Sequence, residues 1–220
     1  MIVSMIVDSG KEIGYFINER KGLIMRAFIG IDLSSQLKYE LEEYRQSFRN
    51  YAKKGRWRHI DNLHITLKFF SEISWEKKLE LDKSVEEICS STSAFSLRLD
   101  KVGMFSGRDV IRTLWIGVGG DLPALNSLYD GIEQEAKAMG FPLEGRKFKP
   151  HITLGQDIIF DRSFEEVKEL AGDPKLPPII VNKIYLFKSE QIGPRRVYTK
   201  VSEYNLQMKS GGGSPASLAL

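Results

Sequence analysis

Apolar positions along the chain follow two different periods, and the changes of period mark the predicted elements. The run 27–31 is apolar apart from one glycine, which is typical of a buried strand, whereas Leu37 and Leu41 open a series at helical spacing. Over the whole chain, the two periods predict helices at 34–54, 75–90, 121–139 and 161–171 and strands at 27–31, 63–70, 94–102, 113–118, 148–154, 179–188 and 197–201. The expected N-caps are Ser34 or Ser35, Ser74 and Asp121. Because helices and strands mix without strict alternation, we expect an α+β fold.

Both ends of the chain lack this periodicity. Residues 1–24 contain three glycines and no sustained period, so we expect an N-terminal extension there, with Met25 as a candidate alternative start. Residues 210–215 read Ser-Gly-Gly-Gly-Ser-Pro, a composition typical of flexible linkers. We therefore expect one folded unit at 25–206, followed by a flexible tail at 207–220.

One tetrapeptide, His-Ile-Thr-Leu, occurs twice, beginning at His64 and again at His151, in a chain with only three histidines. Successive side chains of a strand point to opposite faces, so His64 shares a face with Thr66 and His151 shares one with Thr153. The apolar partners of each copy lie on the other face and are expected in the core. Two such strands predict a site in which two histidines face each other.

The approach to each tetrapeptide is also repeated. A predicted helix and then a basic, aromatic segment precede each copy, at 56–58 for the first and at 146–149 for the second. This repetition indicates two pseudo-symmetric lobes, each of which contributes one motif strand to a shared central cleft.

Composition narrows the class of protein only slightly. With 220 residues and 42% hydrophobic content the chain can bury a sizeable core, and its net charge of +3 does not by itself indicate nucleic-acid binding. The single Cys89 excludes an internal disulfide and fits a reducing compartment. No segment is long and apolar enough to span a membrane, and the opening 1–7 lacks the basic region of a secretory signal. We expect a soluble, cytoplasmic monomer.

A pair of histidines on opposite sides of a substrate can divide acid–base work. One imidazole takes a proton from an attacking oxygen and the other gives one to the leaving oxygen, while threonine hydroxyls hold the anionic oxygens between them. This arrangement suits a phosphodiester and needs neither metal nor cofactor. A zinc site is the weaker alternative, because His59, Cys89 and the carboxylates show no recognisable ligand spacing. The sequence also lacks a nucleophile elbow and a phosphate-binding P-loop.

The segments 25–32, 62–69 and 148–154 resemble the two-histidine (2H) phosphoesterase superfamily, and within it the RNA 2′,3′-cyclic phosphodiesterases, also called 2′-5′ RNA ligases. The resemblance implies a bilobal α+β fold with antiparallel sheets around a central cleft. It implies that His64 is the proton donor, that His151 is the proton acceptor, and that Thr66 and Thr153 bind the phosphate. The implied reaction opens a 2′,3′-cyclic phosphate at an RNA end to a 2′-phosphomonoester, and its reversal is 2′-5′ ligation.

One departure from the family concerns the residues after the second motif. The family commonly has a small residue and then an arginine there, whereas this chain has glycine and then Gln156. Lys68 shares parity with His64 if its strand stays regular, and could partly replace the missing charge. The candidate RNA contacts are Lys68, Arg58, Lys149 and Gln156. Two alternatives stay open: a module that binds RNA or nucleotide phosphate without turnover, and a phosphodiesterase for small cyclic nucleotides or 2′-5′ oligonucleotides.

Overall fold

The computed structural model describes residues 23–208. The expected N-terminal extension and flexible tail fall almost wholly on 1–22 and 209–220, which lie outside the described residues. The first strand starts at Ile24, and Gln207 forms an isolated bridge with Ser93, so backbone pairing of some kind reaches one residue beyond each expected boundary of the folded unit.

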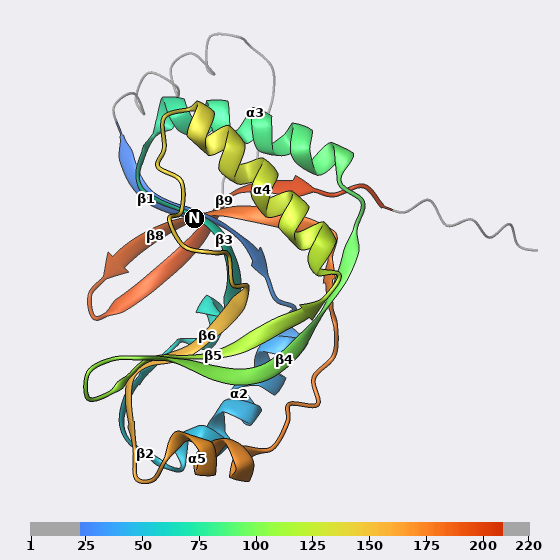
Figure 1. Ribbon diagram of the computed structural model, residues 1–220. Coiled ribbons are helices and arrows are strands. Elements are labelled where there is room, and N and C mark those ends of the chain that lie inside the picture. Colours follow the sequence, from blue (N-terminus) through green and yellow to red (C-terminus); the bar gives the residue numbers. More distant parts are fainter. Residues whose placement is uncertain (1–22, 209–220) are drawn as a thin grey trace, which may run out of the picture.

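The chain folds into a nine-stranded antiparallel sheet. Figure 1 shows how the helices lie against it. The elements are β1 (Ile24–Asp32), α2 (Ser35–Arg49), β2 (Ala52–Trp57), η1 (Ile60–Asn62), β3 (His64–Ser74), α3 (Trp75–Ser91), β4 (Phe95–Ser106), β5 (Ile111–Gly120), α4 (Leu122–Ala138), β6 (His151–Phe160), α5 (Phe164–Ala171), β7 (Ile179–Val181), β8 (Lys183–Ile192) and β9 (Arg195–Asn205). The strand order is β7-β4-β5-β6-β3-β1-β8-β9, and β2 pairs with β6 on the edge opposite β5, beyond the position at which β3 pairs. The fold is α+β, as the sequence predicts.

Two halves of this sheet meet at its centre, between β3 and β6. These strands pair at one position, Ile65 with Ile152, whereas the strands on either side pair along most of their length. Helices α3 and α4 pack on the half that contains β3, β1, β8 and β9, and α2 packs with α5 on the other half (Figure 1). Each half therefore forms one lobe, and each lobe contributes one motif strand to the centre.

Three of the predicted helix N-caps are confirmed. The Ser34 hydroxyl accepts a hydrogen bond from Leu37 N at 3.2 Å, Ser74 caps α3 in the same way, and the Asp121 carboxylate caps α4. These bonds satisfy amides that have no partner inside the helix. They explain why the starts of the helices follow from local sequence.

The ends of several elements differ from the prediction. The helix expected to reach residue 54 ends at Arg49, because 52–57 form β2 and pair with β6. The second motif strand begins at His151, after Pro150, and continues to Phe160 because β5 and β2 pair with its two edges. The strand expected at 179–188 is two strands, β7 and β8, in which β7 pairs with β4 and β8 with β1 and β9. Pairing between distant segments decides each of these boundaries.

Candidate active site

The four motif side chains meet at the centre of the sheet. The antiparallel pair Ile65–Ile152 sets the register, so His64 lies across from Thr153 and Thr66 lies across from His151. Both isoleucines are buried in the core. The two histidines and two threonines therefore share the opposite face, as the alternation of the motif predicts.

His64 is held at both ring nitrogens. Its Nδ1 lies 2.7 Å from the carbonyl oxygen of Asn62, and its Nε2 lies 2.9 Å from Thr66 Oγ1. A carbonyl only accepts, so Nδ1 carries a proton, and Nε2 of the neutral ring is the acceptor. The ring stacks on Phe28 at 4.5 Å and meets the edge of Tyr198 at 5.3 Å. Contacts on its faces and edges hold Nε2 toward the cleft.

His151 repeats this arrangement on the other lobe. Its Nδ1 lies 2.7 Å from the carbonyl oxygen of Lys149, which is again two residues earlier in the chain. The ring lies against Phe105, with centroids 5.5 Å apart, and against Trp115, with centroids 6.1 Å apart. Within residues 23–208, Nε2 has no hydrogen-bond partner, so this nitrogen is free to contact a substrate. The two histidines have the same tautomer and different neighbours.

Both histidines are poor bases in the free protein. Burial lowers the pKa of His64 to about 4, the Arg58 charge adds to the effect, and the bond to the Asn62 carbonyl opposes it. Burial also lowers the pKa of His151, and its bond to the Lys149 carbonyl opposes that shift. Both rings are therefore neutral near pH 7. An anion bound between them would favour the protonated form, because opposite charges at close range raise the pKa of an imidazole.

Two hollows flank the motif strands. The first, of about 1160 Å³, lies on the His64 side, and the second, of about 860 Å³, lies on the His151 side. Thr66, Phe69 and Gln156 line both hollows. The basic residues of the first hollow are Arg26, Arg45, Arg49, Arg56, Arg58, Arg195 and Arg196, against the carboxylates of Glu42 and Asp61. The second holds Lys68, Arg112, Arg146, Lys147 and Lys149, against Glu133 and Glu144. The first hollow has the larger excess of positive charge.

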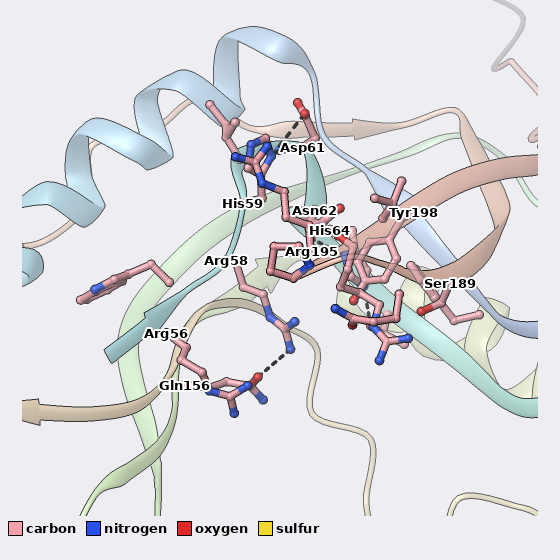
Figure 2. Close-up of a pocket in the computed structure, with 18 of the residues that line it drawn as sticks. Arg56, Arg58, His59, Asp61, Asn62, His64, Gln156, Ser189, Arg195 and Tyr198 are labelled. Carbon is pink, nitrogen blue, oxygen red and sulfur yellow. Dashed lines mark hydrogen bonds and ion pairs between the residues drawn. The ribbon is translucent and has the colours of Figure 1, made fainter. Parts of the chain in front are cut away.

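Arg58 lies beside the residue that departs from the family pattern. Its Nη2 donates to Gln156 Oε1 at 3.0 Å, the bond drawn as a dashed line in Figure 2. Gln156 accepts with its oxygen, so its amide nitrogen keeps its donors. Both residues line the hollow that contains His64. The structure thus brings a guanidinium from the end of β2 to the side chain at position 156.

Lys149, the other basic candidate, lies beside His151. Its ammonium is 4.2 Å from the ring centroid of Trp115 and 5.3 Å from that of Phe105. It lines the second hollow together with His151. Lys149 therefore places a positive charge on the His151 side of the site.

The prediction for Lys68 is wrong, because its strand does not stay regular. Thr66 pairs with Gly30 and Lys68 with Ile29, so Leu67 is an extra residue, a β-bulge. Lys68 consequently takes the parity of the core, where its ammonium lies 2.8 and 2.9 Å from the two carboxylate oxygens of Glu133. It is buried and paired, and it is not a free cation for RNA.

Arg45 is a second basic residue that the fold uses internally. Its guanidinium is buried and donates to the carbonyl oxygens of Arg58 and Leu154, and it pairs with Glu42. Burial lowers the pKa of Arg45 to about 10. Arg45 joins α2 to the ends of β2 and of the second motif, which fixes the position of the Arg58 backbone.

The residues that hold the two motif histidines in place were not predicted from the sequence. Phe28, Tyr198, Phe105 and Trp115 come from four different strands, and the Asn62 carbonyl precedes the first motif. Only Asn62 carried a local signal: it stands two positions before His64, as Lys149 stands two positions before His151, and in both cases the backbone carbonyl binds Nδ1 of the histidine. The four aromatic residues become neighbours of the imidazoles through strand register, which local sequence does not encode.

No group of three or more His, Cys, Asp or Glu side chains within residues 23–208 is placed to hold a metal ion. Of the zinc candidates, Cys89 is buried in α3, and His59 Nδ1 lies 3.3 Å from the Asp61 carboxylate near the surface. None of the helices in the described part of the chain could cross a membrane.

Known proteins resemble this chain over most of its length. An RNA 2′,3′-cyclic phosphodiesterase from Aquifex aeolicus is 27% identical over 185 residues, which cover 83% of this chain and 98% of the relative. Crystal structures of Escherichia coli LigT match with TM-scores of 0.69 in the apo form and 0.71 in complex with 3′-AMP, at 26% and 28% identity, over 84% of this chain and 99% of theirs. The family of LigT like phosphoesterases matches residues 31–115 and 120–198. These findings confirm the resemblance inferred from the motifs, and the chain belongs to the LigT-like phosphoesterase family.

Proposed function

We propose that this protein hydrolyses 2′,3′-cyclic phosphodiesters at RNA ends to 2′-phosphomonoesters, without a metal ion or cofactor. The observation that carries the proposal is the arrangement of the four motif side chains, His64, Thr66, His151 and Thr153, at the centre of the sheet. Two imidazoles, each with Nδ1 bound to a backbone carbonyl, share one face with two threonine hydroxyls. The names of the relatives support the same activity.

The chemistry follows from this geometry. His151 Nε2 takes a proton from water as the water oxygen bonds to phosphorus, and the bond from phosphorus to the ribose 3′-oxygen breaks. His64 Nε2 gives a proton to that leaving oxygen, so the product is a 2′-phosphate. Thr66 and Thr153 donate hydrogen bonds to the non-bridging oxygens. Each proton transfer is typically worth about 10²- to 10⁴-fold in rate.

His64 requires its proton only when the substrate is bound. Its pKa of about 4 in the free protein leaves it neutral, and the phosphodiester anion beside it is what favours the imidazolium. The negative charge of the substrate thus favours protonation of His64, which acts as the general acid. His151 acts as the general base on the opposite side of the phosphate.

The two hollows support the assignment of donor and acceptor. The leaving 3′-oxygen stays attached to the terminal ribose, which is part of the RNA strand. Because His64 gives its proton to this oxygen, we expect the strand to lie on the His64 side of the phosphate. The hollow beside His64 is the larger one, and four of its seven arginines form no ion pair within residues 23–208: Arg26, Arg58, Arg195 and Arg196. The attacking water needs no such surface. We therefore assign the strand to the His64 side.

Arg58 is proposed to supply the positive charge that Gln156 lacks. A guanidinium that donates to phosphate is a charge-assisted contact, worth about 1.5–3 kcal/mol. Gln156 then positions Arg58 and offers its amide to the same anion. Lys149 is proposed as a weaker contact on the His151 side.

The test is hydrolysis of an oligoribonucleotide with a 2′,3′-cyclic phosphate end in EDTA. His64→Ala and His151→Ala should each lose about 10²- to 10⁴-fold in turnover. His59→Ala is the matched control for the chemical step, because His59 is the third histidine and is not part of the motifs. His59 lines the hollow on the His64 side, so KM can change, but kcat should stay near that of wild type. Chromatography of the product should give the 2′-phosphate.

Undiminished turnover in either motif variant would contradict the mechanism, and loss of wild-type activity in EDTA would favour a metal site. Tight, salt-sensitive RNA binding without product would favour the binding module. A panel of small cyclic nucleotides and 2′-5′ oligonucleotides tests the other alternative. Reverse ligation is tested by adding a 5′-hydroxyl RNA. We also propose that the protein acts in the cytoplasm as a monomer.

A further inference from the structure

Asn62 binds the ring of His64 with its backbone and a distant strand with its side chain. Its backbone carbonyl lies 2.7 Å from His64 Nδ1, and its side-chain amide donates to the carbonyl oxygen of Arg196 at 2.7 Å (Figure 2). The Asn62 side chain is buried, and Arg196 lies in β9, 134 positions further along the chain. One residue therefore joins the first motif histidine to β9.

The carbonyl of Asn62 decides which nitrogen of His64 carries the proton. The Thr66 hydroxyl at the other ring nitrogen cannot decide it, because a hydroxyl both donates and accepts. A carbonyl only accepts, so it requires the proton on Nδ1 and leaves Nε2 toward the cleft. When Nε2 takes up a proton, the same carbonyl stabilises the imidazolium through a charge-assisted hydrogen bond. The position of this carbonyl therefore sets the direction of the ring.

The second motif fixes the equivalent carbonyl locally. His151 Nδ1 lies 2.7 Å from the Lys149 carbonyl, the same distance as in the first motif, and the residue between them is Pro150. A proline restricts the residue before it to extended conformations, so the chain itself limits the direction of the Lys149 carbonyl. The Lys149 side chain takes no part in this and lies over the ring of Trp115.

The first motif cannot use a proline in this way. Asn62 is the last residue of the 3₁₀-helix η1, a conformation that a following proline disfavours, and the residue in the place of Pro150 is Leu63. The Leu63 amide donates to the Ile60 carbonyl at 3.2 Å, and a proline has no such hydrogen. Another contact must therefore hold the Asn62 carbonyl.

The side chain of Asn62 provides this contact. The hydrogen bonds of a 3₁₀-helix have poor geometry, so a turn of three residues needs support from other elements. A bond from Lys38 Nζ to the Asp61 carbonyl is long, at 3.3 Å, and exposed. The bond from Asn62 to the Arg196 carbonyl is shorter and partly buried, so it is the firmer attachment of η1 to the sheet.

We infer that Asn62 is a positioning residue, whose side-chain bond to Arg196 holds the carbonyl that orients His64. Pro150 serves His151 in the same way. The inference rests on the proposed function for the roles of acid and base, and it goes beyond that function in naming what fixes each ring. Arg196 also lines the hollow assigned to the RNA strand, so the acid is attached to a β-strand on the substrate side.

Nitrogen NMR of the histidine rings tests the inference without turnover. In the wild-type protein at neutral pH, both motif histidines should carry the ring proton on Nδ1. In Asn62→Ala the His64 signals should shift toward a mixture of the two tautomers, while His151 keeps its wild-type signals. Pro150→Ala should give the reverse result.

A substrate with a sulfur leaving group separates the acid from the rest of the site. A thiol has a pKa of about 8.5, so a 2′,3′-cyclic phosphate with sulfur in place of the ribose 3′-oxygen can release a thiolate without a proton from His64. Because misplacement of a reacting group by about 1 Å can cost about 10²-fold, Asn62→Ala should lower kcat by roughly 10- to 100-fold on the oxygen substrate. It should hardly lower kcat on the sulfur substrate.

Two further variants complete the comparison. Pro150→Ala should lower kcat equally on both substrates, because the base acts on the attacking water in each case. Tyr44→Phe is the matched control, since it removes a side-chain bond of 2.8 Å to the Gly172 carbonyl, between α2 and the end of α5. It should change neither the tautomers nor the ratio of the two rates.

An unchanged His64 tautomer in Asn62→Ala would overturn the inference. An equal loss of kcat on the two substrates would also overturn it, because such a loss would mean that Asn62 only supports the fold. If Asn62→Ala does not fold, Asn62→Asp takes its place, since it keeps the size of the side chain and loses the donor. Failure of the proposed function is a separate result: wild type would turn over neither substrate, and the tautomer of His64 would still decide the role of Asn62.

Discussion

The buried ion pair between Lys68 and Glu133 should make a large contribution to stability. Their side chains are 5% and 6% exposed, and the ammonium lies within 2.9 Å of both carboxylate oxygens. Lys68 also donates to the carbonyl oxygen of Pro142 at 2.7 Å, and Glu133 accepts from the Glu144 amide at 3.2 Å. The pair thus joins β3, α4 and the segment that leads to the second motif.

Glu133→Gln removes one charge and leaves the other buried. Breaking a buried pair in this way typically costs about 3–5 kcal/mol. We expect about 3 kcal/mol here, because Lys68 keeps its hydrogen bond to the Pro142 carbonyl. For a folded unit of this size, that cost corresponds to a fall in Tm of roughly 6–12 °C. Lys68→Met combined with Glu133→Leu removes both charges, and it should recover most of the loss because no unpaired charge remains.

Urea denaturation followed by tryptophan fluorescence, together with thermal melting, measures these differences. The matched control is Glu203→Gln, which breaks the pair between Lys183 and Glu203 at a similar distance of 2.7 Å but with side chains 36% and 44% exposed. It should cost no more than about 1 kcal/mol. Equal costs for Glu133→Gln and Glu203→Gln would refute the reasoning, as would a double variant that is no more stable than Glu133→Gln.

Three further predictions concern the site. NMR titration should find the pKa of His64 near 4 in the free protein, and inorganic phosphate should raise it. The native state binds this proton less tightly than the unfolded chain, in which the pKa of histidine is 6.5, so the free energy of unfolding should fall as the pH drops from 6.5 toward 4. The fall should be smaller in His64→Gln, and an equal pH dependence of the free energy of unfolding in the two proteins would contradict this prediction. Gly103→Ala would place a methyl group 2.3 Å from the Trp115 ring that packs beside His151, so stability should fall by about 1–3 kcal/mol with a loss of turnover; a variant as stable as wild type would show that the ring moves freely. Arg58→Gln should weaken phosphate binding by about 10-fold or more, and an unchanged Kd would remove Arg58 from the site.

Local chemistry in the sequence was sufficient for the centre of the site and for the starts of the helices. His64 and Thr66 share one face because side chains alternate along any strand. The structure keeps this alternation because the bulge comes only after Thr66. The N-cap at Ser34 follows from one side chain and amides a few residues away. Such features depend on residues that are close in the chain.

The tertiary structure decided everything that depends on partner strands. The bulge at Leu67 turns Lys68 into the core and Phe69 into the cleft, and β2 forms where a longer helix was predicted, because β6 offers it an edge. The bond between Arg58 and Gln156 joins residues 98 positions apart. The sequence by itself determined that two His-x-Thr strands exist and which way each presents its histidine. Which charges and rings surround them was decided by strand register, because register is a property of pairs of distant segments and not of either segment alone.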